Sequence, residues 1–231
     1  MKHSMHQDPA LYDNDNLMGA VQLKRAEMDC LTLNSNQWLE LSQSNDSSTR
    51  LKAAEHLLSN NLSGRRLRRS KRVHQRLAQM LDDKDTTVIN GVLLALNRVR
   101  VPVAVPKLVS MLKSGRSSLT RCLSAQGLAH QRAAGAIPAL MMCVDAEETP
   151  LRLKEYCIRA LGEVGNAETG VILASLYSDG LAWEVRWAIA QALMVLHDSR
   201  AKLFFQELHT DNDVPADLRK RAKTWIKRLN H

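Results

Sequence analysis

The sequence predicts an all-α protein, an α-solenoid or superhelix of about six stacked helix pairs. Two observations predict this fold class. Only 4% of the 231 residues are aromatic while 45% are hydrophobic, which favours helices packed through aliphatic side chains over a β-sandwich. In addition, a small-large dipeptide recurs at nearly constant intervals in the middle of each predicted second helix. Regular intervals of this length are typical of repeats that bury their apolar faces against one another.

The recurring dipeptide marks six units of the chain. It stands at His56-Leu57, Ala95-Leu96, Gly127-Leu128, Ala160-Leu161, Ala192-Leu193 and Trp225-Ile226. Successive markers are 39, 32, 33, 32 and 33 residues apart. The first helices of the pairs are expected at Gln37–Leu41, His74–Leu81, Val103–Leu112, Ala136–Val144, Thr169–Tyr177 and Arg200–Leu208.

The fourth unit, residues 136–166, shows the layout of one repeat. Pro138 suits the first turn of its opening helix, where the missing N–H is not needed. Gly165 with Asn166 suits a left-handed exit from its closing helix. In the last unit, Lys220, Lys223 and Lys227 lie opposite an apolar stripe, so that the final helix has the polar outer face of a cap.

The segments RLKEYCIRALGEVGNAETGVILASL and VRWAIAQALMVLHDSRAKLFFQEL resemble the short HEAT repeats of the phycobilisome-lyase-like group. The resemblance covers residues 37–230 and is strongest over 103–208. It implies about six HEAT-like helix pairs. For function it implies at most a role in chromophore handling, where such lyases usually act as paired HEAT subunits. The same architecture serves many unrelated tasks.

Residues 1–36 fall outside the repeats and form an N-terminal segment that we expect to be partly disordered. A capping helix within it is suggested by the apolar pattern of Leu17, Ala20, Val21, Met28 and Leu31. Residues 37–231 are expected to form the solenoid, with a basic insertion at 64–73.

The composition indicates where in the cell the protein is expected and which cofactors it is expected to bind. No stretch approaches the roughly 20 apolar residues needed to cross a bilayer, and the first sixteen residues lack the apolar core of a secretory signal. The four cysteines show neither CxxC nor Cys/His metal spacing. We therefore expect a cytoplasmic protein with buried free thiols and without a metal or another cofactor.

The basic insertion carries much of the net charge of +8. It coincides with the one long interval, 39 residues, between markers. Its cations are Arg65, Arg66, Arg68, Arg69, Lys71 and Arg72. Such a cluster can contact phosphates of DNA or RNA, or dock an acidic protein. The alternative is a solvated turn or helix extension.

A basic residue stands six positions before five of the six markers: Arg50, Arg121, Lys154, Arg186 and Arg219. We name these five residues the ladder. The ladder could line a surface for an extended polyanion. Alternatively, each cation could bond a turn carboxylate or carbonyl of a neighbouring repeat, such as Asp83, Asp145 or Asp179, and so join the stack. Arg159, one residue before its marker, is harder to explain in this way.

Trp183 and Trp187 lie four residues apart and share one helix face. With Tyr177 and Asp179 upstream, they resemble the aromatic and acidic residues of HEAT-like DNA glycosylases. The alternatives are an aromatic pair packed between repeats and a hot spot for a protein partner.

No P-loop, GxSxG or HExxH motif occurs in the sequence. We therefore expect a non-catalytic scaffold or adaptor that binds a protein, with an acidic protein as one candidate. The first alternative is a nucleic-acid-binding protein that contacts backbone phosphates. The remote alternative is a DNA glycosylase or a chromophore lyase.

Overall fold

The computed structural model describes residues 33–59 and 62–229. Within these residues it contains thirteen α-helices, two short 3-10 helices and no β-strand. The prediction of an all-α protein is therefore confirmed. The capping helix predicted from the pattern of residues 17–31 lies outside the described residues.

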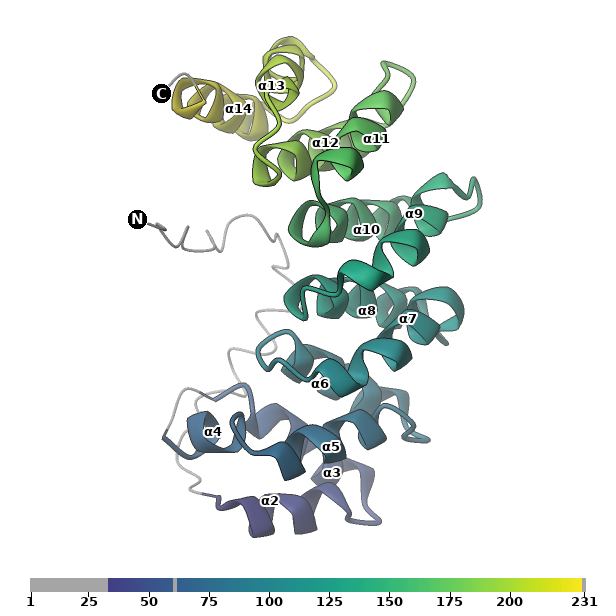
Figure 1. Cartoon of the computed structure of the whole chain (residues 1–231), viewed down its shortest axis with the longest axis vertical. Helices are drawn as coiled ribbons and strands as arrows, with labels where there is room; N and C mark the ends of the chain where they lie inside the picture. The colour runs from purple at the N-terminus through teal and green to yellow at the C-terminus, as the bar shows by residue number, and fades with distance from the viewer. Residues whose placement is uncertain (1–32, 60–61, 230–231) are drawn as a thin grey trace.

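Six helix pairs follow one another along the long axis of the molecule (Figure 1). In chain order the pairs are α2 (Ser35–Ser42) with α3 (Ser47–His56), α5 (Lys71–Met80) with α6 (Thr86–Leu96), α7 (Val105–Ser114) with α8 (Ser118–His130), α9 (Ile137–Asp145) with α10 (Leu151–Val164), α11 (Ala167–Leu176) with α12 (Trp183–Val195), and α13 (Arg200–Thr210) with α14 (Ala216–Arg228). The 3-10 helices Pro102–Ala104 and Ala134–Ala136 lead into α7 and α9. The predicted solenoid of six pairs is confirmed.

One additional helix, α4 (Leu62–Leu67), stands between the first and second pairs. It lies within the 39-residue interval between the first two markers. The extra residues of that interval therefore form a short helix and the loops on either side of it. Leu67 is 1% exposed and attaches α4 to the core. At the N-terminal end, α2 begins at Ser35, within the segment 1–36 that the sequence pattern leaves outside the repeats.

Several helices begin at a side chain that accepts hydrogen bonds from the unpaired N–H groups of the first turn. Asn34 and Gln37 form a capping box at α2, and Asn166 with Thr169 does the same at α11. Asp46 accepts hydrogen bonds from backbone N–H groups in the first turn of α3. Pro138 lies in the first turn of α9, as its position in the sequence predicts.

The left-handed exit predicted at Gly165 is wrong. Gly165 has φ −75° and ψ −179°, which is extended backbone. A Cβ atom here would lie 2.4 Å from the Leu161 carbonyl oxygen and 2.7 Å from a Thr169 methyl carbon. The glycine is therefore explained by close approach and not by a positive φ. Residues with positive φ follow α8 and α12 instead, at Arg132 (50°) and His197 (58°).

The second helices of the first five pairs form a continuous packed row. α3 packs on α6, α6 on α8, α8 on α10 and α10 on α12, whereas the last pair joins the stack through α13, which packs on both α12 and α14. Repeats are therefore closest together on the second-helix side. Between α10 and α12 the backbones approach closely, since a Cβ added to Gly162 of α10 would lie 2.8 Å from the Ala192 Cα atom of α12.

Among the described residues, no helix is long and apolar enough to cross a membrane.

Candidate partner-binding surfaces

The topology gives the stack two different edges. At one edge, which we name the turn edge, short polar turns join the helices within each pair. At the other, the connection edge, the chain passes from one pair to the next, and α4 lies there (Figure 1). The ladder cations lie near the starts of second helices and hence at the turn edge. The basic segment and the ladder are therefore on opposite edges of the molecule.

The basic segment is partly helical. It runs from α4 through a short turn into the start of α5. Arg65, Arg66, Arg69, Lys71 and Arg72 are exposed. Arg72 donates a 3.1 Å hydrogen bond to the side-chain oxygen of Asn36. No ion pair within the described part of the chain involves any of these five cations.

Arg68 differs from its neighbours because its side chain turns back on the fold. Its guanidinium donates to the backbone carbonyls of Leu57 and Ser59, each at 2.7 Å. These carbonyls lie at the C-terminal end of α3, where helix carbonyls lack partners and a cation is favoured. The sequence cannot distinguish this residue from the other five, because the distinction depends on how α4 turns over the end of α3.

Two ladder cations join successive repeats through carboxylates. Arg50 of the first pair forms two hydrogen bonds, of 2.7 and 2.8 Å, with both carboxylate oxygens of Asp83 in the turn of the second pair. Arg186 of the fifth pair lies 2.5 Å from Asp211 in the turn of the sixth. Beside Arg50, hydrogen bonding lowers the pKa of the Asp83 carboxyl. These two charge-assisted pairs join the first repeat to the second and the fifth to the sixth.

Two further ladder cations bond backbone groups. Arg121 donates to the Leu112 carbonyl at 2.9 Å, and its Nη2 atom lies 4.0 Å from the sulfur of Cys143. Arg219 donates to the Asp211 carbonyl at 3.1 Å. Outside the ladder, Arg159 forms a 3.5 Å ion pair with Glu155 on the preceding turn of its own helix, and its Nε atom is buried without a partner in the described structure.

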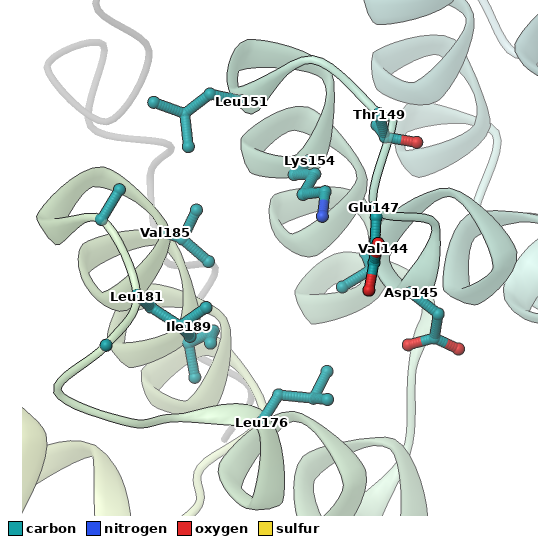
Figure 2. Close-up of a pocket in the computed structure, with 12 residues that line it drawn as sticks. Val144, Asp145, Glu147, Thr149, Leu151, Lys154, Leu176, Leu181, Val185 and Ile189 are labelled. Atoms are coloured by element: carbon teal, nitrogen blue, oxygen red, sulfur yellow. The ribbon is translucent and has the colours of Figure 1, made fainter.

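Lys154 is the ladder residue whose side chain forms no hydrogen bond or ion pair within the described residues. It is half-buried at the wall of a cleft of about 490 Å³ between the fourth and fifth pairs. In Figure 2 its side chain points into the space between the two pairs. The apolar side chains of the cleft include Val144, Leu176, Leu181, Val185 and Ile189. Asp145 and Glu147, which are exposed, also line it.

The two tryptophans of α12 have different surroundings, since Trp187 lies in the core and Trp183 lies at the edge of the stack. Trp187 is only 4% exposed and packs against Phe205 and Trp225, with ring centroids 5.7 and 5.3 Å away. Trp183 is half-buried at the first position of α12. Tyr177 stacks on Phe204 at 3.8 Å, and burial raises the pKa of its hydroxyl. Trp187 is thus an element of the packing between the fifth and sixth pairs.

Three successive helices, α8, α9 and α10, each carry one buried thiol. Cys122 of α8, Cys143 of α9 and Cys157 of α10 are all free and buried. The Cys157 thiol donates a hydrogen bond to the Cys143 sulfur. The spacing of the cysteines matches no known motif. Their contact could nevertheless be predicted from the sequence, because Cys143 and Cys157 lie equally far from Pro150 in the turn that joins two antiparallel helices. Among the described residues, no group of three His, Cys, Asp or Glu side chains could hold a metal ion.

These features define the class of the protein as an α-solenoid of short HEAT-like repeats. A solved structure with this fold is the complex of CpcE and CpcF of phycocyanin lyase from Nostoc sp. PCC7120. It aligns with a TM-score of 0.63 and 21% identity, over 83% of this chain and 75% of that chain. The predicted resemblance to phycobilisome-lyase-like HEAT repeats is therefore confirmed for the fold.

Two engineered proteins also align with the chain. A designed armadillo repeat protein gives a TM-score of 0.49 at 16% identity, over 84% of this chain and 99% of that one. A second engineered protein gives 0.48 at 18% identity, over 92% and 61%. No protein-family profile and no curated protein sequence matches the chain.

Proposed function

We propose that the protein is an interaction scaffold that binds a segment of a protein partner in the cleft between the fourth and fifth helix pairs. A carboxylate of the partner, from Asp, Glu or a chain terminus, pairs with Lys154. An apolar side chain beside that carboxylate packs against Leu181 and Val185. One observation carries this proposal. The ammonium of Lys154 has no bonded partner among the described residues, whereas the side chains of the other ladder residues are bonded.

Comparison along the ladder indicates what Lys154 would bind. Arg50 and Arg186 each receive a carboxylate from the turn of the following repeat. At the corresponding junction, the turn after α11 contributes Gly180, Leu181 and Ala182 to the cleft. At this junction the following turn therefore presents no carboxylate to the cleft, whereas the equivalents of Lys154 bond an aspartate of that turn. A half-buried ammonium with such surroundings gains from a partner carboxylate, because pairing offsets its desolvation.

The charge around the cleft favours protein over nucleic acid at this place. Asp145 and Glu147 line the cleft with Lys154, and residues 137–184 carry 8 Asp and Glu against 3 Lys and Arg. A run of phosphates would be repelled by this surface. A single carboxylate next to apolar side chains meets less of this repulsion than a run of phosphates does, and Lys154 offsets it.

The proposal is tested by selecting random 12-residue peptides displayed on phage against the full-length protein. We expect enriched peptides to contain Asp or Glu beside an aliphatic or aromatic residue. Synthetic copies should bind the Lys154→Met variant at least about tenfold more weakly, since a desolvated charged hydrogen bond contributes about 1.5–3 kcal/mol. Lys154→Arg keeps the charge and should retain most of the affinity.

Lys52→Met is the matched control, because Lys52 is an exposed lysine of α3 far from the cleft. It removes the same charge and should leave the affinity unchanged. Selection of no peptide, selection of basic peptides, or equal binding to Lys154→Met and the native protein would each contradict the proposal. Circular dichroism of the variants checks that they are folded.

A second candidate function, binding of nucleic acid through backbone phosphates, is favoured by the charge of the N-terminal half. Residues 50–132 carry 17 Lys and Arg against 4 Asp and Glu. Five of these cations are the exposed residues of the basic segment, which lie on α4, on α5 and in the turn between them. Arg68 is omitted from this set, because it bonds the end of α3.

Fluorescence anisotropy with duplex and single-stranded DNA and RNA tests this second function. Five phosphate contacts predict a roughly 500-fold loss of affinity over a fourfold rise in salt. Alanine at Arg65, Arg66, Arg69, Lys71 and Arg72 should abolish the binding. Alanine at the exposed Lys220, Lys223 and Lys227 of α14 is the control for a general charge effect. Absence of binding at low salt, or equal loss in both variants, would overturn this function.

A further inference from the structure

The buried thiols of the fourth repeat form an arrangement that packing alone does not require. Cys143 and Cys157 face each other across the helix pair α9 and α10, and the Cys157 thiol donates a hydrogen bond to the Cys143 sulfur. Arg121, from the preceding repeat, places its Nη2 atom 4.0 Å from that sulfur. The Cys143 sulfur thus receives a thiol proton and a guanidinium together.

The surroundings of the two thiols shift their pKa values in opposite directions. The hydrogen bond from Cys157, followed by Arg121, lowers the pKa of Cys143 to about 6. The contact with Cys143 and burial raise the pKa of Cys157. Cys143 is therefore the thiol of the pair that ionises first, and Cys157 is the neutral thiol in contact with it. A thiolate is the reactive form of cysteine.

We propose that Cys143 and Cys157 form a dithiol modification site, which hydrogen peroxide oxidises to a disulfide that joins α9 to α10. Cys143 is 6% exposed and not fully sealed, and its neighbour Val144 lines the cleft. A small neutral oxidant can approach from that side. Cys122 is a neighbouring thiol without these contacts, and burial raises its pKa.

The reaction has two balanced steps. The Cys143 thiolate attacks one oxygen of hydrogen peroxide; the O–O bond breaks, and the departing hydroxide takes a proton to become water. Cys143 is now a sulfenic acid. The Cys157 sulfur then attacks the Cys143 sulfur, the S–O bond breaks, and the hydroxide leaves with the proton of Cys157 as a second water. Two thiols and one peroxide give one disulfide and two waters.

Tryptic peptides of the full-length protein report this bond directly. After peroxide treatment and blocking of free thiols, we expect the peptide of residues 133–152 to be joined to that of residues 155–159, with the loss of two hydrogens. The Cys122 peptide, residues 122–132, should remain unlinked. Met142 is 63% exposed and lies in the first peptide. Its oxidation adds one oxygen and does not respond to dithiothreitol, which distinguishes it from the disulfide.

Variants and pH make the test specific. Cys122→Ser should keep the linked peptide, whereas Cys143→Ser should abolish it and leave Cys157 reduced. Between pH 5.0 and 7.5 the initial rate should rise about tenfold and then level off, as a thiol with a pKa near 6 predicts. An ordinary thiol would keep accelerating to about pH 8.5. Circular dichroism confirms that each variant is folded.

Three outcomes would overturn the proposal. They are a bridge to Cys122 in place of Cys157, oxidation of Cys157 at an unchanged rate in Cys143→Ser, and no linked peptide while Met142 is fully oxidised. The readout is covalent and independent of any partner, so its failure is distinguishable from failure of the proposed scaffold function.

Discussion

At the scale of single residues, the ladder position, six residues before each marker, has different roles in successive repeats. Arg50 and Arg186 use it to hold the next turn through Asp83 and Asp211. Arg121 uses it to hold a carbonyl and to approach a thiol. Lys154 occupies the same position beside an open cleft. The position therefore joins successive repeats at Arg50 and Arg186, where the following turn supplies a carboxylate.

This difference predicts the effect of removing a bonded ladder cation. The Arg50 and Asp83 side chains are 14% and 8% exposed. Arg50→Ala leaves the Asp83 carboxylate buried without its cation, and should lower the free energy of unfolding by about 2–3 kcal/mol. Urea denaturation followed by circular dichroism measures this change.

The exposed ion pair of Lys107 with Asp82 supplies the control, since its side chains are 35% and 66% exposed. Lys107→Ala should cost less than about 1 kcal/mol, because exposed pairs contribute little. Equal losses in Arg50→Ala and Lys107→Ala would contradict the structural role of the ladder.

At the scale of elements, the row of second helices sets how closely repeats approach. Gly162 of α10 lies against the backbone of α12 at Ala192. Gly127 of α8 has more room, because an added Cβ would lie 3.4 Å from the two methyl carbons of Leu108. Both glycines lie in the interior of a helix and are buried. They differ in whether the neighbouring atoms belong to backbone or to a movable side chain.

The two glycines therefore predict opposite results for the same substitution. Alanine in a helix interior is favoured over glycine by about 1 kcal/mol. Gly127→Ala should consequently be neutral or stabilising. Gly162→Ala should lower the free energy of unfolding by about 1–3 kcal/mol, because α12 must shift to avoid the added methyl group. Thermal and urea unfolding of both variants check the sign, and a stabilised Gly162→Ala would refute the close packing of these helices.

The periodic marker predicts the helix pairs but not their contacts. It locates all six pairs, because the apolar face of each repeat recurs at its own period. It does not predict α4, since the basic segment offers only Leu62 and Leu67 as apolar positions in that helix. The cleft beside Lys154 depends on the turn after α11, where Leu181 and not Asp179 lines the cavity. Such a difference depends on the conformation of the turn and cannot be obtained from a one-dimensional pattern.

At the scale of the whole molecule, charge and topology separate two surfaces. The strongly basic residues 50–132 precede the acidic residues 137–184 along the stack, and the pairs follow one another in chain order (Figure 1). In a solenoid each repeat contacts mainly its neighbours. A segment bound at the fourth and fifth pairs thus contacts a surface of different charge from that around α4, and the two candidate functions can be tested independently.

The central claim, that Lys154 pairs with a carboxylate of a protein partner, is tested most directly by a double-mutant cycle. The tightest selected peptide and its version with Asn or Gln at the acidic residue are titrated, by anisotropy, into the native protein and into Lys154→Met. Direct pairing predicts a coupling energy of about 1–2 kcal/mol between the two substitutions. A coupling energy near zero would show that the peptide carboxylate does not contact Lys154, and would contradict the proposed role of the cleft.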